Sequence, residues 1–338
     1  MLTGHTGFKG AWMALRLQQL GALVTGFALA PDSRPNLFDL LAPWSGLASE
    51  VGDIREADAI RRAVGACDPE IVVHMAAQSL VRRSYRQPAE TFAVNVLGTL
   101  NLLAALGRRP RVVLVVTSDK VYDNQETGRP HGEGDPLGGD DPYSASKAAT
   151  ELAVHSWRQS FAPAGKPALA TARAGNVIGG GDWAEDRLVP DVVRAAAAGR
   201  PVVLRYPAAV RPWQHVLDVV DAYLLYAERL ASDGAVPAAL NFGPLDPEPL
   251  PAAKLVERLQ RALQRNEGWQ QASAKAPPEK QYLALDVGLA MRTLDWRPRL
   301  AVAEALDWTA GWYADYLRGA DMRAVSAAQI ERFAGLAA

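Results

Sequence analysis

The stretch "RVVLVVTSDKVYDN" (residues 111–124) begins with five consecutive apolar β-formers after Arg111 and then changes to Thr117, Ser118, Asp119 and Lys120. An unbroken apolar run is typical of a strand buried on both faces, as in a parallel sheet covered by helices. Two interpretations fit the polar end. Either the strand leaves the core in a solvated turn, or its end carries a functional site.

Apolar runs alternate with amphipathic patterns on both sides of this stretch. We predict strands at 21–27, 70–77, 111–118 and 168–179, and helices at 56–67, 88–107, 143–161 and about 189–198. This alternation is typical of β-α-β units, so the predicted fold is α/β: a doubly wound parallel sheet with helices on both faces.

The pattern loosens beyond residue 180 into glycine-rich and proline-bounded segments, which predicts a smaller, interleaved C-terminal lobe. We expect the sheet domain to comprise residues 1–175 plus about 216–245. The lobe, expected to bind substrate, would comprise 176–215 and 246–325.

Composition excludes several classes of protein. The chain has 338 residues, 49% of them hydrophobic, with a formal net charge of -1 and a pI near 6.5. It is therefore long enough for a large core and offers no charged surface for nucleic acid or an anionic membrane. No apolar stretch stands out as a membrane helix, and the N-terminus is not typical of a signal peptide.

The cysteine and histidine content predicts a cytoplasmic chain without a bound metal. Cys67 is the only cysteine, so no internal disulfide can form. The histidines show no metal-ligand spacing, and each is expected to be a local hydrogen-bonding residue: His5, His74, His131, His155 and His215.

The segment "TGHTGFKG" (residues 3–10) places Gly4, Gly7 and Gly10 in a turn that opens a helix. Glycines in such a turn let the backbone approach a pyrophosphate at the helix N-terminus. A simple tight turn is the alternative. Only Met1 and Leu2 precede the turn, so the usual upstream strand is expected to be missing or truncated, with weaker nucleotide affinity as a consequence.

The residues that would hold the adenosine half of a dinucleotide do not decide whether the cofactor is NAD or NADP. Asp53 follows a strand and could meet the adenine amino group, but Ala28 and Ala30 occupy the place of an acidic ribose ligand. Arg34 could pair with a 2′-phosphate or be an ordinary loop charge.

Tyr143 and Lys147 in "YSASK" form a Tyr-x-x-x-Lys pair on a predicted helix. Positions i and i+4 share a face, so the ammonium could lower the phenol pKa from about 10 toward neutrality. In an open parallel sheet ligands bind at the carboxyl ends of strands, so Ser118, Asp119 and Lys120 would face the same crevice as the glycine turn. This favours the functional interpretation of the opening stretch.

With these residues in view, the chain resembles the extended short-chain dehydrogenases/reductases, the NAD-dependent epimerase/dehydratase family. Within this family it is most similar to the group that dehydrates CDP-glucose. The matching segments are "TGHTGFKG", "HMAAQ", "LVRRSY", "NVLGT", "TSDKVYDN", "DPYSASK", "RAGNVIGGGDWAEDRLVPD" and "RPWQHVLD". The resemblance implies a Rossmann-type sheet, bound NAD and a nucleotide-sugar substrate.

In that group the enzyme removes a hydride from C4 of the glucosyl ring, eliminates water across C5 and C6, and returns the hydride to C6. The resemblance implies that Tyr143 deprotonates the 4-hydroxyl beside Lys147 and Ser118, and that Asp119 protonates the departing 6-hydroxyl. Lys120 would be a base at C5 or an enolate stabiliser. A mutual ion pair of Asp119 and Lys120 that only orders the loop is the alternative.

The resemblance also assigns the remaining site residues. The cofactor positions are Gly4, Thr6, Gly7, Phe8, Lys9, Gly10, Asp53, Ile54, Ala76, Ala77, Gln78, Asn95, Thr117, Tyr143 and Lys147. The substrate positions are Asn176, Arg187, Arg211 and His215. Asn95 is expected to support the active-site helix, and Arg187 and Arg211 to hold the diphosphate unless they are surface partners of Glu185 or Asp218.

Two departures from the family pattern concern substrate specificity. The loop "QETGRPHGEGDPLGG" (125–139) lacks the usual aromatic residues, and "APPEKQYLALD" (276–286) lacks a His-Pro-His-Glu run. These departures leave the choice of nucleotide base open. An epimerase or reductase of the same fold is a second hypothesis, which Asp119 argues against because epimerisation expels no hydroxyl. A third is a binding protein that has lost tight cofactor binding through the missing first strand and Ala30. Members of the family commonly pair through two helices, here 89–106 and 143–161, which implies a homodimer.

Overall fold

The computed structural model describes residues 1–162, 167–232, 236–245, 250–273 and 279–336. Within these ranges, seven strands form one parallel sheet in the order β10-β6-β5-β4-β1-β2-β3. The strands are β1 (Leu2–Thr3), β2 (Val24–Ala28), β3 (Leu47–Val51), β4 (Ile71–His74), β5 (Val112–Val116), β6 (Ala168–Ala174) and β10 (Ala239–Phe242). Successive strands are added on one side of β1 up to β3 and on its other side from β4 onward, so the strand order reverses between β1 and β4. This confirms the predicted doubly wound fold.

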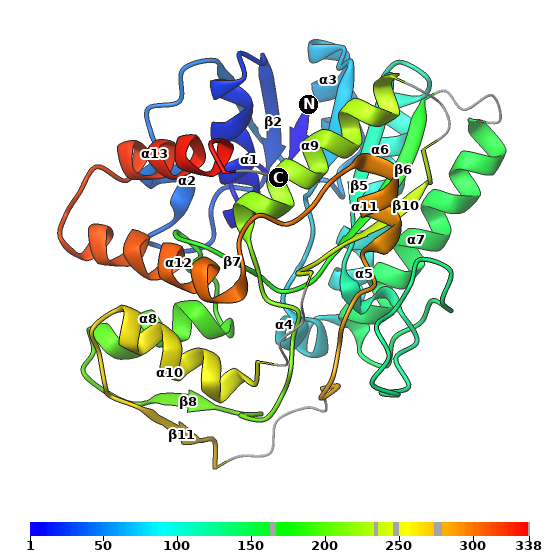
Figure 1. The fold of residues 1–338 in the computed structure, drawn as a ribbon. Coiled ribbons are helices and arrows are strands. Elements are labelled where there is room, and N and C mark those ends of the chain that lie inside the picture. Colours follow the sequence, from blue (N-terminus) through cyan, green and yellow to red (C-terminus); the bar gives the residue numbers. More distant parts are fainter. Residues whose placement is uncertain (163–166, 233–235, 246–249, 274–278, 337–338) are drawn as a thin grey trace.

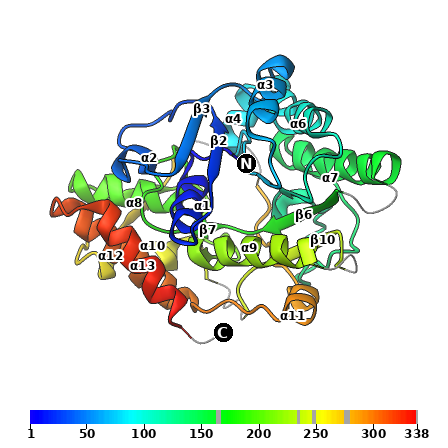
Figure 2. The same cartoon turned by 90° about the horizontal axis from the view of Figure 1, so that it is seen from above.

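Helices cover both faces of the sheet. Figure 2 shows α3, α6 and α7 on one face and α1 and α9 on the other. These helices are α1 (Phe8–Gln19), α3 (Ala57–Cys67), α6 (Gly98–Leu106), α7 (Pro142–Phe161) and α9 (Val216–Ser232). Strand β5 serves both layers, since Val113 and Val115 join the core on the α3 side while Leu114 and Val116 join the core that contains α1 and α9. Burial of both faces explains why this strand is apolar throughout.

The first strand, which we expected to be missing or truncated, is present as the two-residue strand β1. Leu2 pairs with Gly26 of β2 and Val73 of β4. The amide of Gly4 donates to the carbonyl of Phe27 at 2.9 Å, and Leu2 is fully buried. A strand of two residues is too short to show an alternating pattern, which is why the sequence did not reveal it.

The helix predicted at 88–107 is divided into α5 (Pro88–Phe92), a π-helical segment η1 (Ala93–Leu97) and α6. Together Pro88–Leu106 span 19 residues with a mean hydropathy of 1.4, so the described residues include one helix long and apolar enough to cross a membrane. Our expectation that no stretch would pass that test was wrong. The same composition is found in helices of soluble proteins, and 39% of this span is buried inside the molecule.

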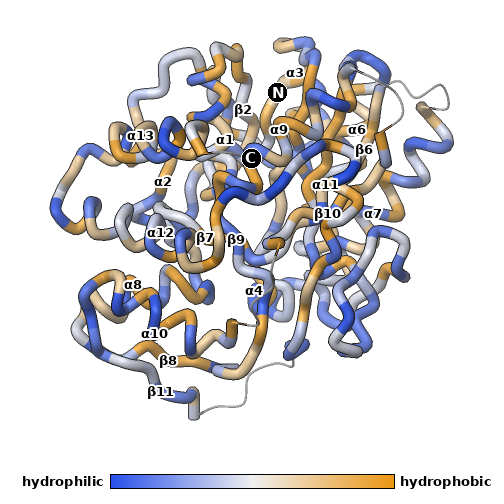
Figure 3. Tube along the Cα trace, viewed as in Figure 1, coloured by the Kyte–Doolittle hydropathy of each residue, from blue (hydrophilic) through white to orange (hydrophobic). Residues whose placement is uncertain are grey.

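The smaller lobe lies below the carboxyl ends of the strands (Figure 1). It contains α8 (Leu188–Ala197), α10 (Ala252–Ala262) and the parallel pair β8 (Val202–Leu204) and β11 (Trp269–Gln271). Hydrophobic and hydrophilic residues are mixed along α8 and α10 in Figure 3, as expected for helices with one buried face. The expected boundary at residue 246 and residues 276–278 of the "APPEKQYLALD" segment lie outside the described residues.

The remaining elements connect the two parts. The pair β7 (Val177–Ile178) and β9 (Gln214–His215) joins the sheet to the lobe. Helix α13 (Met322–Ala334) packs against α1 and against α12 (Val302–Leu317), and α12 in turn contacts α10 of the lobe (Figures 1 and 2). The short elements are α2 (Leu37–Leu40), α4 (Val81–Arg86), the 3₁₀ turn η2 (Asp119–Val121) and α11 (Gly288–Leu294).

Candidate functional site

A cavity of about 650 Å³ opens at the carboxyl ends of β1, β4 and β5 and extends into the lobe. Most of the residues predicted for the site line it. From the sheet domain these are Gly4, Thr6, Gly7, Phe8, Lys9, Gly10, Asp53, Ile54, Ala76, Ala77, Gln78, Thr117, Ser118, Asp119, Lys120, Tyr143 and Lys147; from the lobe side they are Asn176, Arg187 and Arg211. Asn95 and His215 are not part of the lining.

The glycine turn has the shape required by a bound diphosphate. A Cβ on Gly4 would lie 2.7 Å from the amide nitrogen of Ala76, and one on Gly10 would lie 2.0 Å from the Gly4 carbonyl oxygen. These two glycines are therefore required by packing. A Cβ on Gly7 would meet only the Gly4 oxygen, at 3.4 Å, and would otherwise project into open space. Helix α1 starts directly after Gly7 without a side-chain cap, so its first amides are free to bind an anion.

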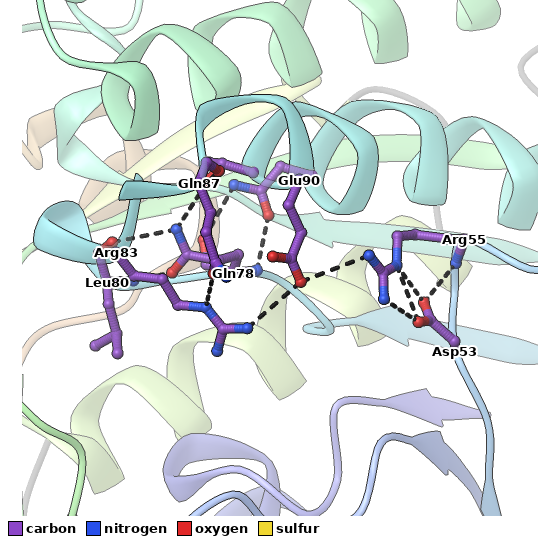
Figure 4. Close-up of polar contacts among 9 residues, drawn as sticks. Asp53, Arg55, Gln78, Leu80, Arg83, Gln87 and Glu90 are labelled. Atoms are coloured by element: carbon purple, nitrogen blue, oxygen red, sulfur yellow. Dashed lines mark hydrogen bonds and ion pairs between the residues drawn. The ribbon is translucent and has the colours of Figure 1, made fainter. Parts of the chain in front are cut away.

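Asp53, expected to meet an adenine, is already engaged by a neighbour. Its carboxylate accepts hydrogen bonds from the Arg55 backbone amide at 2.9 Å and from Arg55 Nε at 2.9 and 3.0 Å. Arg55 lowers the pKa of Asp53. Figure 4 shows the contacts continuing from Arg55 to Glu90 (3.5 Å) and from Glu90 to Arg83 (3.4 Å) along the cavity edge. Arg34, considered for a 2′-phosphate, lies outside the lining.

Asn95 connects three elements behind the cavity. Its Oδ1 accepts from the Gln78 amide at 2.9 Å, and its Nδ2 donates to the Gln78 carbonyl (3.1 Å) and to Ser146 Oγ (2.8 Å). Asn95 lies in η1, Gln78 follows β4 and Ser146 lies on α7. The asparagine thus holds the loop after β4 against the helix that carries Tyr143.

Tyr143 and Lys147 lie on the cavity side of α7. The side chain of Asp141 caps this helix by accepting from the Ser144 amide at 3.0 Å, and Pro142 occupies the first helical position. This start places Tyr143 in the first turn. Lys147 Nζ donates to the Val116 carbonyl at 3.2 Å, and Ser118 lies close enough to the Tyr143 phenol to lower the phenol pKa.

The acidity of this pair differs from the expectation drawn from helical spacing. Burial raises the pKa of Tyr143 to about 12, although the nearby Ser118 opposes the change. Burial also lowers the pKa of Lys147 to about 7. The prediction that the ammonium makes the phenol acidic was wrong for the protein alone, because the cavity disfavours the charged form of both groups.

Asp119 is buried at the end of β5, so the solvated-turn interpretation of this strand end was wrong. Ser118 Oγ donates to Asp119 Oδ1 at 2.9 Å, while Oδ2 is buried without a hydrogen-bond partner. Burial raises the pKa of Asp119, and the nearby Lys120 opposes that shift. No ion pair joins Asp119 to Lys120 in the part of the chain that the structure describes. A buried carboxyl group with a raised pKa is suited to donating a proton.

Arginines line the lobe side of the cavity. Arg187 contacts Asp182 at 3.0 Å and Ser79 Oγ at 2.8 Å, and Arg211 contacts Glu279 at 3.3 Å. The alternative partners considered for them, Glu185 and Asp218, were therefore wrong.

His215 does not reach the substrate side of the cavity. The His215 side chain is completely buried, and its ring lies edge-on to that of Trp308 with 5.8 Å between the ring centroids. Burial lowers the pKa of His215 to about 3. The structure therefore argues against the expected substrate contact, since the neighbouring Val216 and Leu217 anchor this segment in the core.

Sequence reasoning gave no role to two other cavity arginines. Arg82 and Arg205 both donate to Oδ1 of Asp186, at 2.7 and 2.9 Å, and all three line the cavity. Arg82 lies on α4 and Arg205 directly follows β8. The arginines in "LVRRSY" and "VVLRYP" are the only sequence feature that points to these two residues. That both contact Asp186 depends on the tertiary fold.

Comparison with known proteins identifies the family to which this chain belongs. The model of the NAD dependent epimerase/dehydratase family matches residues 1–243. This chain belongs to that family. It is 41% identical over 340 residues to the CDP-glucose 4,6-dehydratase of Salmonella typhimurium, covering 98% of this chain and 95% of the relative. It is 28% identical to a dTDP-glucose 4,6-dehydratase of Xanthomonas campestris, covering 93% and 92%.

Solved structures of the epimerase/dehydratase family share the fold. The dTDP-glucose 4,6-dehydratase DesIV from Streptomyces venezuelae, with NAD bound, superposes with a TM-score of 0.81 at 24% identity and covers 95% of this chain and 98% of its own. The UDP-glucose 4-epimerase of Thermus thermophilus in complex with NAD gives 0.80 at 25% identity, with 94% and 98% covered. Dehydratases and epimerases thus share one scaffold, and the site residues have to distinguish between them.

Proposed function

We propose that this protein is an NAD-dependent nucleotide-sugar 4,6-dehydratase that converts CDP-glucose to CDP-4-keto-6-deoxyglucose. The observation that carries the proposal is Asp119, a buried carboxyl group with a raised pKa and an unpaired Oδ2, in the same cavity as Tyr143. An elimination must protonate a leaving hydroxyl, whereas a 4-epimerisation expels none. The 41% identity to a CDP-glucose 4,6-dehydratase supports the same choice.

The residues of the glycine turn fit NAD. The open space above Gly7 and the uncapped start of α1 would receive the diphosphate, and Ala76 and Thr117 would lie along the cofactor. When bound, NAD supplies a reversible hydride acceptor, so no external redox partner is needed.

Tyr143 is the base for the sugar 4-hydroxyl in this proposal. Its phenol is protonated in the protein alone, because burial raises its pKa to about 12. A bound nicotinamide cation would favour the phenolate, and Ser118 would hydrogen-bond the reacting oxygen. Asp119 would then donate its proton to the departing 6-hydroxyl, with Lys120 as the base at C5 or the group that stabilises the enolate.

The lobe side of the cavity would hold the rest of the substrate. Asn176, Arg187 and Arg211 line it, and guanidinium groups suit a diphosphate because they donate forked hydrogen bonds. The sheet domain would thus bind the cofactor, and the lobe would bind the nucleotide part of the substrate.

The decisive experiment incubates purified protein with NAD and CDP-glucose and measures the alkaline absorbance of the 4-keto product. Parallel reactions with UDP-, GDP- and dTDP-glucose test the nucleotide. Product from CDP-glucose alone is expected. Conversion to a galactose epimer without the 4-keto chromophore would identify an epimerase, and absence of NAD binding would identify a non-catalytic binding protein.

We also propose a cytoplasmic homodimer formed through α5–η1–α6 and α7. Large apolar side chains are exposed on these helices: Phe92 (38%), Leu97 (57%), Leu152 (59%) and Phe161 (58%). Such a surface favours a partner of matching shape, and two copies of a helix pair can bury it as a four-helix interface. The high mean hydropathy of Pro88–Leu106 is consistent with burial on both sides of this helix.

A further inference from the structure

Glu151 is a buried carboxylate with no role in the chemistry described above. It lies on α7, four residues after Lys147 and eight after Tyr143, so the three side chains follow one face of the helix. Glu151 is 4% exposed and does not line the cavity. It is therefore placed behind the reacting groups.

Both oxygens of Glu151 are held from neighbouring strands. Thr117 Oγ1 donates to Oε1 at 2.5 Å, and Thr171 Oγ1 donates to Oε2 at 2.8 Å. Arg173 Nη2 also donates to Oε2 at 2.8 Å. Thr117 immediately precedes Ser118, so the carboxylate joins α7 directly to the strand end that carries Ser118 and Asp119.

The arginine that pairs with Glu151 is itself fixed. Arg173 Nη1 donates to the Tyr122 hydroxyl at 2.9 Å and to the Glu133 carbonyl at 3.1 Å. The Tyr122 hydroxyl donates to Asn241 Oδ1 at 2.6 Å. Arg173 Nε is buried without a hydrogen-bond partner, but the other bonds of this network hold Glu151 from two strands and fix its position.

The charges that face Lys147 come from several elements. Burial, and after it the charge of Lys9 on α1, lower the pKa of Lys147, whereas Glu151 raises it. His74 on β4 also faces Lys147, and burial together with the Lys147 charge keeps its pKa at about 3, so it is neutral. Glu151 is thus the group that opposes burial and the Lys9 charge in keeping Lys147 protonated.

We propose that Glu151 is a positioning residue that keeps the Lys147 ammonium charged and holds the end of β5 in register with Tyr143. This role for Glu151 depends on the proposed function in one respect: a charged Lys147 and bound NAD must take part in the reaction. It predicts that Glu151 acts on cofactor binding and on the pH dependence of turnover, not on recognition of the nucleotide sugar.

The test compares Glu151→Gln with Thr171→Val, which removes one hydrogen bond to the same carboxylate but leaves its charge and the Thr117 contact. Without the negative charge, Lys147 should lose its proton at lower pH. We expect the NAD dissociation constant of E151Q to rise about tenfold near pH 8 but less than about threefold near pH 6, because one pKa unit corresponds to a factor of ten. T171V should follow the wild type at both values.

Turnover gives a second readout. The alkaline limb of the kcat profile should move to lower pH by about one unit in E151Q, with KM for the nucleotide sugar within about twofold of the wild type. Glu151→Asp, which keeps the charge but shortens the side chain, should retain the wild-type profile at a lower rate. If E151Q does not fold, because Arg173 is left buried without its partner, the double variant E151Q/R173M takes the place of E151Q in the comparison. The double variant removes both charges of the buried pair.

Two results would overturn the inference. One is an E151Q profile parallel to that of the wild type at all pH values; the other is equal weakening of NAD binding in E151Q and T171V. A wild-type protein that binds NAD but does not convert CDP-glucose would instead contradict the proposed function. In that case the NAD titrations still decide the role of Glu151.

Discussion

Ser118 donates a 2.9 Å hydrogen bond to one carboxylate oxygen of Asp119, and the other oxygen is buried without a partner. Ser118 also lies close enough to the phenol of Tyr143 to lower the phenol pKa. One serine therefore connects the proposed acid to the proposed base, which lie on different elements. This arrangement brings both groups to the same sugar while keeping Asp119 largely desolvated, the condition under which a carboxyl group retains its proton.

Asp119→Asn removes the transferable proton but keeps the size of the side chain. We expect kcat for dehydration of CDP-glucose to fall about 10²- to 10⁴-fold, with KM changed by less than about threefold. Because oxidation at C4 does not need Asp119, the absorbance of reduced nicotinamide should still appear on mixing with substrate. Loss of that signal together with turnover would show that Asp119 acts before the elimination.

Gly7→Ala and Gly10→Ala separate cofactor binding from folding. The Cβ of G7A would project into the cavity, whereas that of G10A would lie 2.0 Å from the Gly4 oxygen. We expect G7A to weaken NAD binding at least about tenfold with little change in melting temperature, and G10A to destabilise the fold by about 2–4 kcal/mol. Calorimetry with NAD and thermal unfolding measure the two effects; equal NAD affinity in G7A and wild type would contradict the placement of the diphosphate.

Arg187→Ala tests the substrate side of the cavity, with Glu185→Ala as its control. Arg187 lines the cavity and contacts Asp182, whereas Glu185 is exposed and is not part of the lining. Loss of a charge-assisted contact to the diphosphate should raise KM for CDP-glucose about 10- to 100-fold, equivalent to about 1.4–2.8 kcal/mol. The control should stay within about twofold. Steady-state kinetics with saturating NAD measures both, and an unchanged KM in R187A would remove this residue from the substrate site.

Asp218 makes the stability of the protein depend on pH. Burial raises its pKa to about 7, although it accepts a hydrogen bond from the Arg299 amide. The folded state therefore keeps a proton that the unfolded state releases near pH 4, and this group lowers stability as pH rises from about 4 to about 7.

Asp218→Asn cannot ionise and should not show that loss. Denaturant unfolding of both proteins at about pH 5 and pH 7.5 should show the unfolding free energy of D218N, relative to that of the wild type, higher by about 1–3 kcal/mol at the higher pH. A difference between the two proteins that does not vary with pH would show that Asp218 is ionised in the folded state.

Leu97→Asp and Leu152→Asp test the proposed dimer. Both side chains are more than half exposed in the single chain, so a charge there should cost the monomer little while placing an unpaired carboxylate in a helix interface. Analytical ultracentrifugation should show a dimer for the wild type and monomers for the double variant. Leu23→Asp, at a position 95% exposed and directly before β2, is the control. A wild-type monomer would contradict the proposal.

The order of helices and strands could be read from the sequence because it follows from local patterns. Strand β5 is apolar throughout since helices cover both of its faces, and α7 begins at Pro142 because Asp141 caps it. Strand β1 could not be recognised in this way. Its two residues take their conformation from the ladders with β2 and β4 and not from their own sequence pattern.

Part of the site was also predictable, because in a doubly wound sheet the ends of neighbouring strands must meet. That rule predicted that the glycine turn, Ser118 and Asp119 would share one cavity, and they do. The same rule could not predict that Arg82 of α4 and Arg205 after β8 both contact Asp186. It also could not show that His215 is buried behind the cavity.

The sequence by itself determined the alternation of strands and helices, the glycine turn and the i, i+4 spacing of Tyr143 and Lys147, because each depends on neighbours along the chain. Only the tertiary structure decided which side chains of the lobe and of distant helices join the cavity, and how acidic the groups in it are. The pKa of Tyr143 is raised, not lowered, because desolvation depends on everything packed around the phenol, including elements far away in sequence.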